Sequence, residues 1–82
     1  MGHLADHGGW PAVLEQLVAG RDLSADAARA AMDEILAGEA TPAQLGAFVV
    51  ALRTKGEAVA ELNGMLDAML DAALLVPLSP GL

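Results

Sequence analysis

The segment 41–57, TPAQLGAFVVALRTKGE, constrains the fold most, because it predicts one helix with a start signal and a stop signal. Thr41 can cap the helix with its hydroxyl, Pro42 suits the first helical position, and Gln44 completes a capping box. Gly56 supplies the left-handed residue that ends many helices. Both ends of this helix are therefore specified by its own sequence.

The middle of this predicted helix is apolar on every side. Each residue in the stretch LGAFVVAL, 45–52, is apolar or glycine. A helix of this kind is buried on nearly every side, so we expect the rest of the chain to pack around it. Arg53 and Lys55 follow in the last turn, where cations complement the helix dipole and pair with surface acids such as Glu57. A second interpretation is that the two cations grip an anion.

Three further segments carry apolar residues at helical spacing. They are 10–20, which opens at Trp10-Pro11; 24–38, which Ser24 caps and Gly38 ends; and 59–73. Their predicted buried stripes are Val13, Leu14, Leu17 and Val18; Ala27, Ala28, Ala31, Met32, Ile35 and Leu36; and Val59, Leu62, Met65, Leu66, Met69 and Leu70. Trp10 is expected to be a half-buried anchor rather than a ligand-stacking residue. The sequence therefore predicts an all-α domain over 10–73, a small bundle of four short helices joined by short turns.

Composition favours one small helical domain. A chain of 82 residues suits a single domain, and its 55% hydrophobic content includes only 2% aromatics, which favours close-packed helices over sheets. The net charge of −7 argues against binding to nucleic acid or to an anionic membrane surface. The chain has no cysteine, hence no thiolate chemistry, and no visible signal peptide. We therefore expect a cytoplasmic protein.

The two ends of the chain are predicted to lie outside the bundle. Residues 1–9 are polar, end in a glycine pair, and indicate a flexible N-terminal tail. His3, Asp6 and His7 could share one side of a turn there, but a metal site needs more ligands and a rigid frame. Residues 74–82, LLVPLSPGL, are apolar yet interrupted by two prolines, so they cannot continue the last helix. They indicate the start of a linker to a missing domain.

No residue is predicted to be catalytic, cofactor-binding or metal-binding. The sequence has no glycine-rich phosphate loop, and both histidines lie in the tail, away from any Ser/His/acid set. Asp33 and Glu34 would suit acid–base chemistry only if buried, and we expect both to face water because adjacent helical residues point in different directions. Met65 and Met69 are expected to fill the core.

Two stretches carry a resemblance to a known family. They are RDLSADAARAAMDEILAGEATPAQLGAFVVALRTKGE and the following VAEL, with their methionine-acid pair, Gly-Glu, Pro-x-Gln, Ala-Phe and Ala-Leu-Arg-x-Lys-Gly-Glu. With these motifs the segment from Trp10 to about Met69 resembles the N-terminal helical domain of anthranilate phosphoribosyltransferase, of the glycosyltransferase family 3 and nucleoside phosphorylase helical-domain superfamily. Pyrimidine nucleoside phosphorylases share this helical domain but usually differ at the counterpart of LRTKGE.

The resemblance implies a role within a larger enzyme. The full-length enzyme would transfer a phosphoribosyl group from phosphoribosyl pyrophosphate (PRPP) to anthranilate, with Mg²⁺, in tryptophan biosynthesis. Its Gly-Thr-Gly-Gly-Asp phosphate loop belongs to a following α/β domain, before which this chain would be truncated. No catalytic or cofactor-binding residue is therefore carried over, and the chain alone is expected to be inactive. For these helices the resemblance implies a homodimer interface and one wall of the cleft between domains.

One position departs from the family pattern. The family usually has Thr or Ser after Lys-Gly-Glu, capping the fourth helix together with a glutamate three residues on. Here Ala58 stands at the cap position and Glu61 remains. Losing the hydroxyl is expected to cost about 1 kcal/mol.

Two alternatives of other classes stay open. The chain could be a stand-alone helical protein–protein interaction module with a dedicated partner. It could also be an acyl-carrier-like protein that holds phosphopantetheine on Ser24, although the carrier signature runs Asp-Ser-Leu and this chain has Asp22-Leu23-Ser24. We further expect the isolated chain to associate through apolar helix faces, because four short helices enclose only a small core.

Overall fold

The computed structural model describes residues 3–75 and is helical throughout its regular elements. The elements, in chain order, are a 3-10 helix η1 (Leu4–His7) and the α-helices α1 (Gly9–Val18), α2 (Ala25–Leu36), α3 (Pro42–Lys55) and α4 (Val59–Leu75). Within the described residues there is no strand. The predicted all-α bundle of four short helices is therefore confirmed.

The predicted start signals of α2 and α3 form in the structure. The Ser24 hydroxyl accepts a hydrogen bond from the Ala27 N–H at 3.1 Å. At α3 the Thr41 hydroxyl accepts from the Gln44 N–H at 3.1 Å, and the Gln44 side-chain oxygen accepts from the Thr41 N–H at 2.9 Å. These reciprocal bonds satisfy backbone groups that a helix leaves unpaired at its start.

The predicted stop signals of α1 and α2 form as well, whereas Gly56 ends α3 with φ +92° and ψ +129°, outside the left-handed helical region. At the end of α1, Gly20 has a φ of +80°, which glycine adopts without steric cost. Its N–H donates to the Leu17 carbonyl at 2.9 Å, and the Arg21 N–H donates to the Gln16 carbonyl at 3.0 Å. This pair of bonds is a Schellman motif, and Gly38 ends α2 in the same way. Short links therefore follow α1 and α2, which folds the helices back onto one another.

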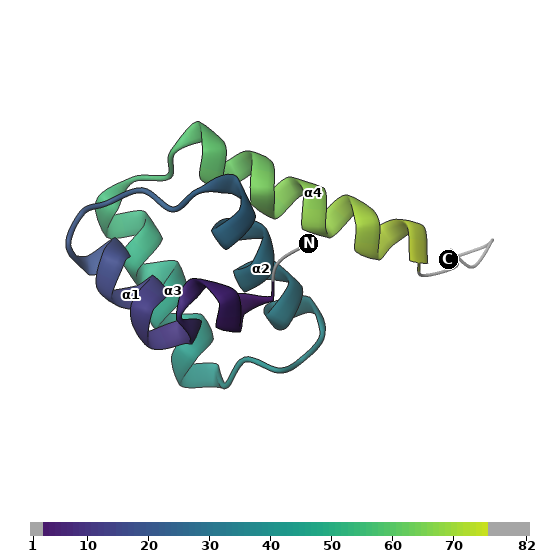
Figure 1. Ribbon diagram of the computed structural model, residues 1–82, viewed down its shortest axis with the longest axis horizontal. Coiled ribbons are helices and arrows are strands. Elements are labelled where there is room, and N and C mark those ends of the chain that lie inside the picture. Colours follow the sequence, from purple (N-terminus) through teal and green to yellow (C-terminus); the bar gives the residue numbers. More distant parts are fainter. Residues whose placement is uncertain (1–2, 76–82) are drawn as a thin grey trace.

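The helices pack into a bundle from which α4 extends to one side (Figure 1). The closest backbone packing joins α2 with α4 and α1 with α3. Gly64 of α4 lies against the backbone of Ala25, so close that a Cβ on Gly64 would lie 2.9 Å from the Ala25 carbonyl carbon. Small side chains thus set how near α4 comes to α2, and the rest of α4 is placed by that crossing.

One core joins all the elements. Its buried members are Leu4, Trp10, Val13, Leu17, Leu23, Ala27, Ala28, Ala30, Ala31, Phe48, Ala51, Leu52 and Met65. Phe48 is 1% exposed and meets the Trp10 ring edge-on, with ring centroids 5.4 Å apart. Such edge-to-face pairs stabilise beyond their buried area. Trp10, predicted to be half-buried, is in fact fully part of this core.

The N-terminal segment differs from the predicted flexible tail over 1–9. Residues Leu4–His7 form η1, and the Leu4 side chain is buried in the core. The His3 N–H donates to the Asp6 carboxylate at 3.1 Å, which closes the turn. The sequence pattern missed this turn because a single leucine among polar residues gives no periodic signal.

The ends of α4 agree only in part with the sequence. The helix was expected over 59–73 and runs over Val59–Leu75, so the first two residues of the predicted linker 74–82 belong to its last turn. Residues 76–82 of that linker lie outside the described part of the chain. Among residues 3–75, no helix is long and apolar enough to cross a membrane.

The prediction that α3 is buried on nearly every side is wrong. Only Phe48, Ala51 and Leu52 of this helix are buried, whereas Leu45, Val49 and Val50 are exposed. The described residues thus cover only part of the surface of α3. The apolar sequence of α3 therefore exceeds what the described residues can bury.

Candidate functional site

The apolar stripe predicted for the buried face of α4 lies mostly at the surface. Leu62, Leu66, Met69 and Leu70 are 50%, 50%, 43% and 54% exposed. Val59, at the start of the same stripe, is also exposed, and Met65 alone of the predicted residues is buried. The prediction of a buried stripe is thus wrong for most of its members.

The face that α4 does bury carries smaller and more polar residues. It consists of Glu61, Gly64, Met65 and Ala68. Gly64 and Ala68 let the backbone of α2 approach closely, which large side chains would prevent. Gly64 and Ala68 therefore face the core, and most of the large apolar residues of α4 face outward.

We call the exposed set Leu62, Leu66, Met69 and Leu70 the α4 stripe. Its members recur at intervals of four, three and one residues, which places them on one side of a helix. Asp67 and Asp71 lie outside this stripe, and Asp71 pairs with Arg29 of α2. The stripe is therefore a continuous apolar ridge with acidic residues beside it.

An apolar groove lies between α2, α3 and α4. It has a volume of about 270 Å³ and is lined by Met32, Ile35, Leu45, Phe48, Val49, Leu52, Arg53, Glu57 and Met65. We call it the α3–α4 groove: five of its lining residues belong to α3, two to α2 and one, Met65, to α4, and Glu57 lies in the link between α3 and α4. Met65 is the member that links the groove to the α4 stripe, since it is three residues after Leu62 and four before Met69.

The groove and the stripe together suit contact with another apolar surface. Contiguous exposed apolar patches on small domains mark interaction sites. The only cation and the only acid of the groove, Arg53 and Glu57, stand beside the link between α3 and α4. The groove can bind an apolar surface and exclude water from it, and its lining contains no histidine, serine, threonine or lysine.

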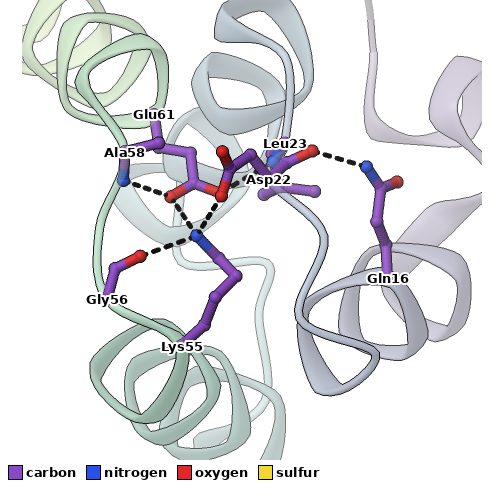
Figure 2. Close-up of polar contacts among 7 residues, drawn as sticks. All are labelled: Gln16, Asp22, Leu23, Lys55, Gly56, Ala58 and Glu61. Carbon is purple, nitrogen blue, oxygen red and sulfur yellow. Dashed lines mark hydrogen bonds and ion pairs between the residues drawn. The ribbon is translucent and has the colours of Figure 1, made fainter.

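A polar cluster lies at the junction of three backbone segments (Figure 2). The Lys55 Nζ donates to the Glu61 carboxylate at 2.8 Å, to the Asp22 carboxylate at 2.8 Å and to the Gly56 carbonyl at 2.7 Å. These bonds use all three protons of the ammonium group. The Lys55 side chain is only 5% exposed. Lys55 is thus a buried and fully satisfied cation, which corrects the prediction of a surface partner.

The Glu61 carboxylate is the centre of this junction. One oxygen accepts from the Ala58 N–H at 2.8 Å and from Lys55, and the other accepts from the Leu23 N–H at 2.7 Å. The side chain is fully buried. Burial by itself raises the pKa of Glu61, but the hydrogen bonds from Ala58, Lys55 and Leu23 outweigh burial and hold that pKa below its usual range.

The pKa of Lys55 moves the other way. Burial alone lowers it, but hydrogen bonds to Asp22 and Glu61 and the charges of both carboxylates raise it above its usual range. Both members of the pair are therefore ionised at neutral pH. A pair held charged and fully bonded has no proton to exchange with a substrate, so the junction is suited to holding the helices rather than to acid–base chemistry.

The remaining residues singled out in the sequence have structural contacts. The Trp10 indole N–H donates to the Glu34 carboxylate at 3.1 Å, so Glu34 serves the core rather than facing water alone. Asp33 lies 3.8 Å from Arg29 in an ion pair one turn apart. The hydroxyl of Ser24 is engaged in the cap of α2. In the described residues, no group of three or more histidine, aspartate or glutamate side chains is placed to hold a metal ion.

Sequence reasoning missed the role of Glu61. A glutamate is almost never fully buried unless it is paired, so the sequence pattern of the fourth helix does not predict the burial of Glu61. One signal was present: Glu61 stands three residues after the cap position, where a capping-box glutamate bonds back to the cap N–H. Its partner Lys55, six residues earlier and in another helix, has no comparable sequence signature.

Comparison with known proteins gives a consistent result. Residues 11–73 match the family described as the glycosyl transferase family, helical bundle domain. The matched range covers all of α2 and α3 and most of α1 and α4.

Individual relatives agree with that match. The chain is 60% identical over 70 residues to an anthranilate phosphoribosyltransferase of Saccharopolyspora erythraea, covering 85% of this chain and 19% of the relative. It is 58% identical over 73 residues to one of Nocardioides sp., covering 88% and 21%, and 51% identical over 75 residues to one of Streptomyces avermitilis, covering 92% and 21%. The chain thus spans about a fifth of the length of these curated relatives.

Proposed function

The chain belongs to the glycosyl transferase family, helical bundle domain, and on that premise we propose that it serves as the helical N-terminal domain of an anthranilate phosphoribosyltransferase-like enzyme. The full-length enzyme transfers phosphoribosyl from PRPP to anthranilate in tryptophan biosynthesis, in the cytoplasm. Within it, these helices contribute a dimerisation surface and one wall of the cleft between domains.

One observation supports this assignment most: many large apolar side chains of the described residues are exposed. The α4 stripe and the exposed side of α3, with Leu45, Val49 and Val50, stand open beside a complete core. A helical domain that packs against a second subunit and a second domain needs such surfaces. The relatives are about five times as long as the matched segment, which leaves ample chain to cover them.

The chemistry is assigned to the part of the enzyme outside this segment. Residues 3–75 do not fit a metal ion, and the groove lining offers no phosphate-binding loop. Following the resemblance, we propose that Mg²⁺ and PRPP bind in the α/β domain of the full-length enzyme. The chain by itself is expected to be inactive.

A chimera tests the assignment. Residues 11–73 replace the matched segment of the Saccharopolyspora erythraea relative, and transfer to anthranilate is followed by the loss of anthranilate fluorescence. Retained activity with PRPP and Mg²⁺ is the expected result, because the segment supplies packing surfaces and no reacting group. The control is the same relative without its helical segment. A chimera that folds and dimerises but fails to transfer phosphoribosyl would overturn the assignment.

The open apolar surface also favours a second candidate, a stand-alone helical interaction module with a dedicated partner. The two candidates differ in what covers the α4 stripe. In the enzyme the cover belongs to the same polypeptide or to its identical copy, whereas a module binds a different protein. A chimera with full activity would favour the enzyme, since a surface adapted to another partner would not fit the relative's remaining domain.

A further inference from the structure

Three backbone segments meet at the carboxylate of Glu61. The Leu23 N–H comes from the link between α1 and α2, the Ala58 N–H comes from the link between α3 and α4, and Lys55 belongs to the last turn of α3. Figure 2 shows these groups pointing toward Glu61 from separate segments. A single side chain of α4 thus ties the start of that helix to both links.

The bonding pattern requires a charged carboxylate. Each of the two oxygens faces at least one donor: Leu23 on one side, Ala58 and Lys55 on the other. A carboxylate offers acceptors only, so it satisfies both sides. A glutamine of nearly the same shape has one NH2 group, which must face a donor whichever way the amide turns. A neutral side chain of the same shape therefore cannot replace Glu61.

The junction lies where α3 and α4 meet. α3 contributes most of the lining of the α3–α4 groove and α4 contributes Met65, but the closest backbone packing joins α4 to α2 and α3 to α1. Direct polar attachment between α3 and α4 comes from Lys55 and Glu61. The groove residues Arg53 and Glu57 stand on either side of Lys55 in the sequence, so the junction adjoins the groove along the chain.

We propose that Glu61, with Lys55 and the N–H groups of Leu23 and Ala58, is a latch that fixes the angle between α3 and α4 and thereby sets how far Met65 stands from the α3 side of the apolar groove. Glu61 acts as a positioning residue: it holds two helices and touches no ligand. When its charge is removed, the two links are released together and the angle between α3 and α4 varies, while the packing of α4 on α2 keeps the helix attached.

Distance measurement between two spin labels tests the latch. The chain has no cysteine, so cysteines introduced at the exposed residues Ala43 and Ala73 are the sole attachment sites. These positions are near the far ends of α3 and α4 and do not line the groove. A change of angle at the junction therefore gives its largest displacement between them.

The expected result is one narrow distance distribution in the otherwise unmodified chain and a broadened or shifted one in Glu61→Gln. The matched control is Asp22→Asn, which removes a carboxylate from the same Lys55 but leaves all three bonds of Glu61 in place. It should keep the narrow distribution. An equally narrow distribution at the same mean distance in Glu61→Gln would overturn the proposal.

Amide exchange gives an independent test that does not depend on the variant folding. In the unmodified chain the N–H groups of Leu23 and Ala58 should share one protection factor, because a single opening releases both. In a folded Glu61→Gln chain both should exchange at least about tenfold faster, since a lost buried partner costs over 1 kcal/mol. If Glu61→Gln shows no helical circular dichroism, the unmodified chain decides: protection factors that differ between the two amides refute a common latch.

Discussion

At the scale of single residues, the start of α4 is only half capped. The Glu61 carboxylate accepts from the Ala58 N–H, which is one of the two bonds of a capping box. The second bond would run from the Glu61 N–H to a hydroxyl at position 58, and alanine has none. The bond to Glu61 therefore explains why α4 still begins at Val59. The missing hydroxyl at Ala58 leaves the helix start without its second capping bond.

Restoring that hydroxyl should stabilise the chain. We expect Ala58→Ser to raise the free energy of unfolding by about 1 kcal/mol, the usual value of a helix cap. Urea unfolding followed by circular dichroism measures the change. Ala60→Ser, two residues later and exposed, is the control and should not stabilise. No gain at position 58 would show that the Glu61 bond alone satisfies this helix end.

The ionic junction makes stability depend on pH in a defined direction. The pKa of Glu61 is lowered in the folded chain, so its contribution is complete above the ordinary glutamate pKa of about 4.3 and is lost as pH falls through the folded value. The pKa of Lys55 is raised, so its contribution is complete below about 10.4 and is lost as pH rises through the folded value.

We therefore expect a plateau of stability between these limits, with a decline on each side. Glu61→Gln should flatten the acid decline, and Lys55→Met should flatten the alkaline one. Chemical unfolding at a series of pH values measures both limbs. Asp67→Asn, which removes an exposed carboxylate from the same helix, should leave the Glu61 part of the acid limb in place. An acid limb of the same slope in Glu61→Gln would contradict the assignment of that limb to the junction.

At the scale of elements, the crossing of α2 and α4 depends on one missing side chain. A Cβ at Gly64 would lie 2.9 Å from the carbonyl carbon of Ala25 and 3.1 Å from its Cα. These atoms belong to the backbone of α2 and cannot rotate away. The helices can approach this closely only with glycine at that point.

Two glycine-to-alanine variants should therefore change stability in opposite directions. Gly64→Ala should lower the free energy of unfolding by about 1–3 kcal/mol, the usual cost of overpacking. Gly46→Ala, in α3 with no atom within 4 Å of the added Cβ, should raise it by about 0.5–1 kcal/mol through helix propensity. Thermal unfolding of both variants measures the contrast. A stabilised Gly64→Ala chain would mean that the crossing of α4 over α2 is looser than described.

The positions of the helices could be predicted from the sequence, but the side of each helix that faces the core could not always be predicted. Caps and stop signals are local: Thr41, Gln44 and Gly20 form bonds within a few residues, so sequence spacing reveals them. Which side of α4 turns inward depends on a partner far away in sequence. Large apolar residues such as Leu66 favour burial, yet the close approach at Gly64 decides the orientation.

The same limit applies to the candidate site. The excess of apolar residues in α3 and the stripe pattern of α4 were visible in the sequence, and with them the expectation of a contact surface. Whether these apolar residues are buried or exposed could not be predicted, because that depends on how much of α3 and α4 the neighbouring elements cover. The junction of Lys55 and Glu61 needs two helix ends and a distant link to meet, and no local pattern encodes that meeting.

At the scale of the whole molecule, a small core and a large open apolar surface should make the chain associate. We expect the solution mass, measured by light scattering over a wide concentration range, to exceed that of the monomer, with Leu66→Ser shifting the chain toward the monomer. Because Leu66 is half exposed, the substitution should cost little stability in the monomer.

Leu36→Ser is the control for that experiment. Leu36 has a similar exposure, 47%, but it lies at the end of α2 and outside the α4 stripe. The Leu36→Ser substitution should therefore leave the solution mass of the chain unchanged. If both variants and the unmodified chain are monomers at every concentration, the stripe is not covered by a second copy, and its cover is the remaining domain of the proposed enzyme or a different partner protein.

The pairing of Trp10 with Phe48 has a practical optical consequence. Trp10 is the single tryptophan of the chain, and it links α1 to α3 through the ring contact and α1 to α2 through the indole N–H bond to Glu34. Its fluorescence therefore comes from one known place where three helices meet. Water entering there would shift the emission to longer wavelength, so the protein carries its own indicator of whether its helices are still together, with no added dye.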